Sequence, residues 1–153
     1  MPVTGAEAKI YDALMAAAVA AGEAAGFPAK TGIALPNVGF TPPKGAGGKR
    51  KEYLSVTYMP NGASLDGLPF DSDETHIGLL QVSVFWPSGD GIVKPLEAAA
   101  LIVDAFPPGR AFERNGIVVR IDVLPTVAGP LQESDLVQIP VTIRWRAGIA
   151  ADA

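Results

Sequence analysis

The chain has 153 residues, a formal net charge of −4 and no cysteine. The length corresponds to about one domain, and we expect residues 1–153 to form it. The absence of cysteine excludes disulfides, thiolate nucleophiles and cysteine metal sites. The acidic balance, with a pI near 4.9, argues against specific nucleic-acid binding. Charged residues make up only 18% of the chain. So low a fraction is expected where a partner covers part of the surface, and an alanine-rich composition alone also produces it.

The first predicted element is an amphipathic helix. Thr4 and Glu7 stand in a T-x-x-E capping box, in which both side chains satisfy backbone N–H groups at a helix start. Gly26 is expected to end the helix. The apolar run 13–22 is too short to cross a bilayer, which takes about 20 residues, so we expect no membrane partner. The predicted apolar stripe of the helix consists of Ile10, Leu14, Ala17 and Ala21.

Residues 44–51 read KGAGGKRK, a glycine-rich basic loop. They do not form a phosphate-binding loop, because Pro43 stands where the motif needs its first glycine and Arg50 replaces the Ser or Thr that would hold magnesium. We expect a flexible, solvated loop. The alternative is a loop that becomes ordered on an acidic partner surface. The candidate assembly residues of this loop are Lys44, Lys49, Arg50 and Lys51.

Residues 52–59 alternate between apolar and polar side chains and predict a strand, which a Pro-Asn-Gly sequence ends. An acidic loop, residues 61–76, is expected to follow, and it carries the only histidine, His76. Its Asp-Ser-Asp sequence begins like a calcium loop, but Thr75 and His76 break the motif. A solvated loop is therefore the better interpretation, and a weak divalent-cation contact is the alternative. The candidate assembly residues here are Asp71, Asp73 and Glu74.

Residues 77–106 are the centre of the predicted fold. Residues 77–86 have the period of two that is typical of a strand with one buried face. After a Pro-Ser-Gly-Asp-Gly break, residues 92–106 have the period of a helix. A strand that leads into a helix over so short a break lays the helix back on the sheet. The side chains expected inside are Leu80, Val82, Val84 and Trp86 of the strand, and Ile92, Leu96, Ala99, Val103 and Phe106 of the helix.

The C-terminal third predicts two further sheet elements. Asn115-Gly116 between two apolar runs indicates a hairpin of residues 111–114 and 117–124. Residues 134–146 alternate most clearly, with Pro140 indicating an edge strand or a bulge. The side chains of this last strand expected inside are Val137, Ile139, Val141, Ile143 and Trp145.

These elements predict an α+β fold. We expect a mostly antiparallel sheet of about four main strands plus a minor hairpin arm, with two helices packed on one face. The opposite face is polar and suited to a wet subunit contact, and it carries the last candidate assembly residues, Arg144 and Arg146. Residues 147–153 are expected to be a loose tail.

The sequence carries no catalytic constellation. A single histidine in an acidic loop is a poor general base, and no apolar wall is predicted beside the carboxylates to raise a pKa. Nucleophile-elbow, dinucleotide-binding and zinc motifs are all missing. We therefore predict no catalytic residue, no cofactor and no metal.

Several structural motifs in order and spacing carry a family resemblance. Together they resemble the tail-terminator-like proteins of long-tailed phages and prophages. The motifs are FTPP at 40–43, YLSV at 53–56, GLLQVSVFWP at 78–87, GDG at 89–91, IVDAFP at 102–107 and QIPVTIRW at 138–145.

The resemblance implies a structural virion protein and not an enzyme. Such a protein forms a hexameric ring that caps the tail tube, ends its polymerisation and presents a surface to the head. The implied partners are further copies of the chain, the tail tube protein and a head–tail connector or neck protein. The implied place is the head-proximal end of the virion tail, after assembly in the host cytoplasm. A closed ring needs two complementary patches on each subunit, and the basic loop and the acidic segment 66–74 are expected to supply opposite charges.

Three other classes stay open. The first is another neck or tail-completion component on a similar fold. The second is a small-molecule enzyme or binder, which should show one apolar pocket with converging polar groups. The third is a nucleic-acid module, whose binding through the basic loop would fall steeply with salt.

Overall fold

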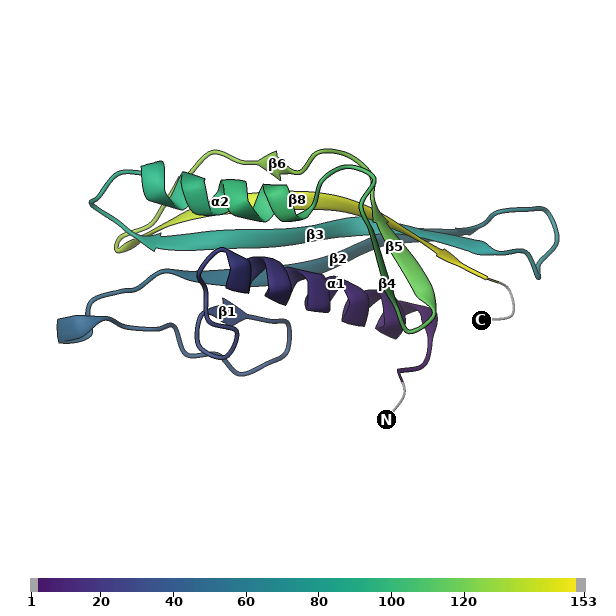
Figure 1. Ribbon diagram of the computed structural model, residues 1–153, viewed down its shortest axis with the longest axis horizontal. Helices are drawn as coiled ribbons and strands as arrows, with labels where there is room; N and C mark the ends of the chain where they lie inside the picture. The colour runs from purple at the N-terminus through teal and green to yellow at the C-terminus, as the bar shows by residue number, and fades with distance from the viewer. Residues whose placement is uncertain (1–2, 151–153) are drawn as a thin grey trace.

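The computed structural model describes residues 3–150. It is an α+β structure with a mostly antiparallel sheet and two α-helices, which confirms the predicted class (Figure 1). No helix among the described residues is both long and apolar enough for a membrane span. The elements are α1 (Ala6–Ala24), β1 (Ile33–Ala34), the short 3-10 helix η1 (Ala46–Gly48), β2 (Tyr53–Leu65), β3 (Glu74–Pro87), α2 (Val93–Ala105), β4 (Ala111–Arg114), β5 (Ile117–Ile121), β6 (Thr126–Val127), β7 (Leu131–Gln132) and β8 (Leu136–Ile149).

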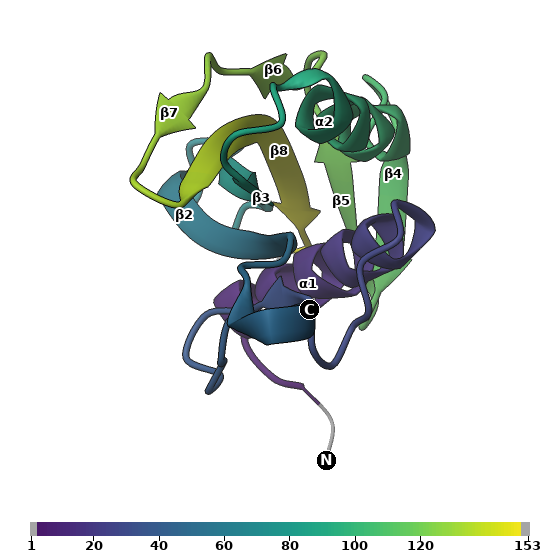
Figure 2. The same ribbon diagram turned by 90° about the vertical axis from the view of Figure 1, so that its left-hand side faces the viewer.

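The sheet has the strand order β1-β2-β3-β8-β5-β4, and only the β1–β2 pair is parallel. Strand β8 is central. Its one edge pairs with β3 along its whole length, and its other edge pairs in turn with β7, β6 and β5. Viewed along its long axis, the sheet is strongly curled (Figure 2). The short strands β1, β6 and β7 were not predicted.

One hydrophobic cluster joins both helices to the inner face of the sheet. The register places Val82 between Val56 and Val141 on three neighbouring strands, and all three side chains are at most 4% exposed. From the helices, Leu14 and Ile102 enter the same cluster and are fully buried. Both helices therefore pack on one face, and the predicted inward alternation of β3 and β8 is confirmed from Leu80 to Val84 and from Val137 to Trp145.

Strands β2 and β3 extend beyond the bounds that the sequence predicts. The predicted loop at 61–76 is wrong, because β2 continues through Pro60 to Leu65, which pairs with Glu74. A register shift between Pro60 and Gly62 accommodates the proline, since an irregularity in the ladder tolerates a residue without an N–H donor. Only residues 66–73 form the connection. The result is a long β2–β3 arm, in which β8 pairs with β3 as far as Glu74 and only the turn at residues 66–73 extends beyond the sheet.

Strand β8 also exceeds its predicted length. The expected loose tail is wrong up to Ile149, which pairs with Glu74 and is 8% exposed. Ala150 follows the strand and is exposed, and the rest of that expectation falls on residues 151–153, outside the described residues. Pro140 lies in the interior of the sheet and not at its edge. Its carbonyl accepts a bond from the Ala128 N–H, so the side that lacks a donor faces short strand β6 and not β3.

Helix α2 buries a stripe that is rotated from the predicted one. Ile92 and Leu96 were expected inside but are 37% and 38% exposed. The helix is apolar on several sides, so its period does not decide which side faces the sheet. Because alanine side chains are small, they let the helix approach the sheet closely, and the side of the helix that carries them is buried. The buried set is Pro95, Ala98, Ala99, Ile102 and Phe106.

The start of α1 lacks the predicted capping box. Its N-cap residue is Gly5, and no side chain caps the helix. The Glu7 carboxylate instead accepts a bond from the Tyr58 hydroxyl at 3.0 Å. The Glu7 carboxylate, which the motif predicts at the helix N-terminus, therefore binds Tyr58 on the sheet.

Asp12 links α1 to the turn of the β4–β5 hairpin. Its Oδ2 accepts bonds from Arg114 Nε at 2.7 Å and Asn115 Nδ2 at 2.9 Å, and these two bonds hold the pKa of Asp12 below its ordinary value of 3.8. Because the pKa is depressed in the folded state, the stabilisation is present at neutral pH and is lost as the pH falls through the folded pKa.

We expect Asp12→Asn to lower the free energy of unfolding by about 0.5 kcal/mol at neutral pH, since the pair is partly exposed. The difference from the wild type should vanish in strong acid. Urea unfolding at neutral pH and well below about pH 4 measures it. Asp104→Asn is the control, because Asp104 is exposed on α2. An equal loss in both variants would contradict a specific role for Asp12.

Candidate assembly surfaces

The basic loop, residues 44–51, closes on itself at one end of the molecule. Lys44 and Arg50 form an isolated antiparallel bridge, and the Gly45 N–H donates to the Lys49 carbonyl at 2.7 Å. Two successive glycines in the turn have φ values of 72° and 76°, and residues other than glycine rarely adopt such positive φ values. The loop's glycine run is thus required by its geometry. Lys44, Lys49 and Lys51 are exposed and form no salt bridge with any part of residues 3–150.

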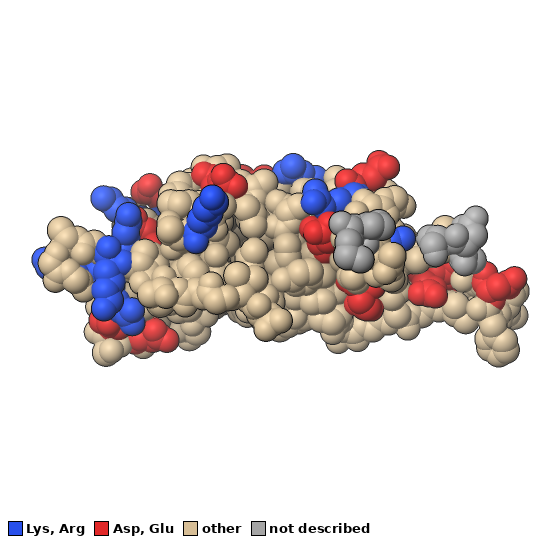
Figure 3. Space-filling view, turned by 90° about the horizontal axis from the view of Figure 1, so that it is seen from below, with Lys and Arg blue, Asp and Glu red and all other residues tan. Residues whose placement is uncertain are grey.

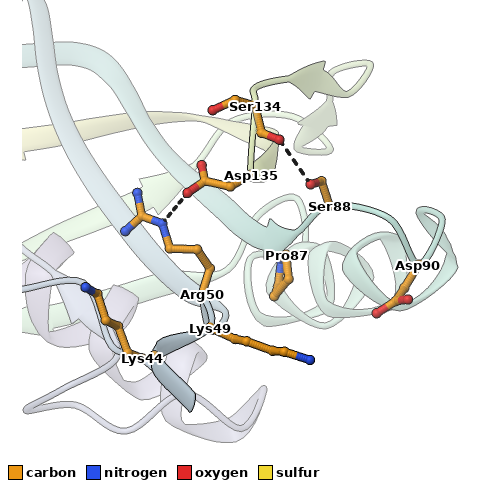
Figure 4. A pocket seen from close by; sticks show the side chains of 9 residues that line it. Lys44, Lys49, Arg50, Pro87, Ser88, Asp90, Ser134 and Asp135 are labelled. Atoms are coloured by element: carbon orange, nitrogen blue, oxygen red, sulfur yellow. Dashed lines mark hydrogen bonds and ion pairs between the residues drawn. The ribbon is translucent and has the colours of Figure 1, made fainter. Parts of the chain in front are cut away.

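Arg50 differs from these lysines because its charge has an internal partner. Its Nε donates to Asp135 Oδ2 at 2.7 Å, and the guanidinium holds the pKa of Asp135 below its usual range. In Figure 4, Arg50 points at Asp135 across an open groove of about 940 Å³, whereas Lys44 and Lys49 point away from that pair. Arg50 therefore ties the basic loop to the segment before β8.

The arm formed by β2 and β3 projects from the opposite end of the molecule (Figure 1). Its tip, residues 66–73, is closed by a bond from the Asp66 N–H to the Asp73 carbonyl at 2.8 Å. The Thr75 hydroxyl donates to the Asp66 carboxylate at 2.6 Å, and the Ser72 hydroxyl donates to the Pro69 carbonyl at 2.6 Å. These bonds give the tip a defined turn.

The most exposed large apolar side chains of the described residues lie on this tip. Leu68 is 98% exposed and Phe70 is 95% exposed, and the exposed residues Asp71 and Asp73 follow them directly. Two such side chains side by side at the end of an arm have no role in the fold, and they are typical of an interaction site. From the sequence, only the acidic residues of this segment were expected to contribute to assembly.

A polar cluster that includes the only histidine lies at the start of β3, next to the tip of the arm. His76 was expected in a solvated loop, but it lies in β3 and is 6% exposed. Its Nδ1 lies 3.1 Å from Glu7 Oε1 and its Nε2 lies 2.9 Å from Glu74 Oε1. Glu74, a predicted assembly residue, therefore contacts His76 beside the tip of the arm. The two carboxylates contact different nitrogens of the imidazole ring, so the imidazole and the two carboxylates do not surround one common position.

Arg144 and Arg146 lie on the outer face of β8, as predicted, and both are exposed. Arg146 Nε donates to Asp122 Oδ1 at 2.6 Å, and Arg120 stands opposite Arg146 in the register. Like charges directly opposite each other repel, and Asp122 offsets part of that repulsion. Within residues 3–150 Arg144 forms no salt bridge.

A second apolar surface, the α2 patch, was also missed. It consists of side chains on the outward side of the helix that are 37% to 68% exposed: Ile92, Val93, Leu96 and Leu101. A signal for both surfaces is present in the sequence. Leu68 and Phe70 stand without any period among carboxylates and glycine, and α2 has more large apolar residues than one buried stripe can hold.

The described residues offer no centre for a metal ion. No group of three or more His, Asp or Glu side chains within residues 3–150 is arranged to hold one. The surface grooves are open. One is lined mainly by charged and small polar side chains, and a second by Phe40, Pro42 and Pro43 together with lysines. The described part of the chain instead has two unlike protruding ends, the basic loop and the arm tip (Figure 1).

Comparison with known proteins assigns the chain more narrowly. A family model described as "Phage tail terminator protein" matches residues 9–145. The chain therefore belongs to the phage tail terminator proteins, and it is a structural protein of the virion tail.

The other comparisons add the fold. No curated protein matches the chain. Among solved structures six chains match, and one of them is 22% identical with a TM-score of 0.72, covering 94% of this chain and 96% of its own. At that identity the likeness shows the fold alone.

Proposed function

We propose that this single-domain chain forms a ring that caps the phage tail tube, ends tail polymerisation and forms the surface that joins the head. Its partners are further copies of itself, the tail tube protein and a connector or neck protein. It acts at the head-proximal end of the tail after assembly in the host cytoplasm, as a structural part without catalysis or a cofactor.

One observation supports ring formation. The basic loop and the apolar, acidic arm tip protrude at opposite ends of the long axis (Figure 1). In Figure 3 Lys and Arg side chains gather at the end of the basic loop, beside a few acidic ones, while Asp and Glu side chains mark the end of the arm. A subunit with unlike, complementary ends associates head to tail, and such contacts close into a ring when the rotation between subunits permits.

The native mass of the purified chain tests this proposal. Light scattering over a range of protein concentrations, with and without magnesium and tail tube protein, should give a discrete mass of six subunits in at least one condition. A second readout is tail length, because tails assembled without a terminator should continue to grow. A strict monomer in every condition, together with tails of normal length in the absence of the chain, would favour another neck component.

We expect the basic loop to contribute to assembly. Replacing Lys49, Arg50 and Lys51 with serine should weaken ring formation about tenfold, because peripheral interface charges mainly set the encounter rate. The variant Lys49→Ser with Lys51→Ser should retain the Arg50–Asp135 pair, and its stability should stay within about 0.5 kcal/mol of the wild type.

Sedimentation and tail joining measure the effect of the triple variant, with Lys94→Ser on α2 as the control. Ring formation and tail joining that stay intact in the triple variant would remove the basic loop from the interface.

A further inference from the structure

We propose that the arm tip of one subunit inserts into a groove between residues 30 and 44 of the next subunit. This inference rests on the proposed ring, and it names the two surfaces through which neighbouring copies meet.

The arm tip has the chemistry of an anchor. Leu68 and Phe70 stand almost fully exposed on a turn that backbone and side-chain bonds define. A preformed turn loses little conformational entropy when it docks. Since Asp66 and Asp71 flank the two apolar side chains, the best acceptor is an apolar groove with a positive rim.

The groove has this character. It has a volume of about 620 Å³, and its lining includes Phe40, Pro42 and Pro43, with Lys30 and Lys44. Both lysines are exposed and form no salt bridge within the described part of the chain. They are therefore available to the carboxylates of an incoming tip.

Contacts within the subunit hold the lining of the groove in place without a partner. The Phe40 ring lies 5.3 Å from the Tyr53 ring, which stacks on Phe85 at 4.7 Å. These contacts hold segment 40–43 against strands β2 and β3. The two prolines fix their own φ angles and restrict the residues before them, so the wall of the groove is preorganised.

Charge distinguishes this groove from the other exposed apolar surface. The α2 patch has Glu97 and Asp104 on the same helix and only Lys94 as a cation, so it would repel the acidic tip. The segment that lines the groove, within residues 30–44, lies near β1 and leads into the basic loop, away from the tip of the arm (Figure 1). A subunit cannot fill its own groove with its own arm, and docking between copies follows.

Cross-linking tests this contact directly, because the chain contains no cysteine. Leu68→Cys and Thr41→Cys are mixed, one of them tagged, and treated with a short bismaleimide. We expect one cross-linked product that joins the two different variants, and little product from either variant alone. The pair Leu68→Cys and Ala100→Cys is the matched control, since Ala100 is exposed on α2.

Charge exchange gives an independent readout. Asp71→Lys should weaken assembly at least tenfold, as should Lys44→Glu, while the unfolding midpoint of each variant stays unchanged. In a mixture of the two variants, a contact between the introduced lysine of one variant and the introduced glutamate of the other pairs opposite charges again, so assembly should be stronger in the mixture than in either variant alone. Failure of both single variants to weaken assembly would count against the docking.

The outcomes separate the contact from the function. No Leu68–Thr41 product at concentrations where the wild type has ring mass overturns the docking and leaves the ring intact. A product between Leu68→Cys and the tail tube protein alone also overturns it, by assigning the arm to the tube. A wild type that stays monomeric with tube protein and fails to limit tail length overturns both.

Discussion

Replacing Trp145 with alanine is expected to lower the free energy of unfolding by about 3–5 kcal/mol. Trp145 is 1% exposed and heads the fully buried side chains by size. It stacks on Tyr58, with 6.0 Å between ring centroids and 10° between planes, and it pairs with Gly78 on one side and Ile121 on the other. A domain has only about 5–15 kcal/mol of stability in total, so this loss should bring the chain close to unfolding.

Trp145→Phe is the matched control. The Trp145 Nε1 is buried without a hydrogen-bond partner, and an unpaired buried donor costs about 1–3 kcal/mol. Phenylalanine removes that donor while it keeps most of the ring, so the two effects offset and the net change should be below about 1.5 kcal/mol. Denaturant unfolding of both variants measures the difference. A phenylalanine variant as unstable as the alanine variant would contradict the packing account.

Replacing Gly78 with alanine should cost about 1–3 kcal/mol through overpacking. A Cβ atom at this position would meet the Trp145 ring, and it would lie 2.8 Å from the Met59 carbonyl oxygen and 2.9 Å from Pro60 Cα. Two of these neighbours are backbone atoms beside the register shift of β2, so relief requires a shift at the root of the arm. Assembly should therefore weaken by more than the stability loss alone explains.

Gly148→Ala supplies the control for this prediction. Gly148 lies in β8, and a Cβ there would have no atom within 4 Å. Alanine should be neutral or stabilise the strand by about 0.5 kcal/mol, because it loses less backbone entropy on folding than glycine. Unfolding midpoints and native masses of both variants are the measurements. Equal effects at the two glycines would show that the close approach at Gly78 is not responsible.

The fold was predictable where a pattern is local and repeated. Alternation in β3 and β8 assigned the inward side chains correctly, since a period of two leaves only two choices of face. The same reasoning failed for α2, where Ile92 and Leu96 compete with the alanines for the buried side. It also failed at Pro60, because a local strand-ending signal was outweighed by continued pairing with β3 and by pairing of β3 with β8 beyond it.

The charged candidates were found, but their partners were not. Arg50 and Asp135 are 85 positions apart in the chain, and Glu7 and His76 are 69 positions apart. Sequence periodicity does not reveal pairs so far apart in the chain. A cation with an internal partner therefore could not be distinguished, from the sequence, from a cation without one. Leu68 and Phe70 were missed for a different reason. Apolar residues are normally read as core, and only their lack of any period marks them as exposed.

The central place of β8 has a consequence for synthesis on the ribosome. Because β8 is the last strand among the described residues, β3 keeps an open edge and β5 has only β4 as a neighbour until residues 136–149 have emerged. Pairings over such long separations form slowly, and chains grow at about 5–20 residues per second. A chain that lacks β8 therefore has no complete sheet, and only a subunit that includes β8 can present a correctly held arm to its neighbours.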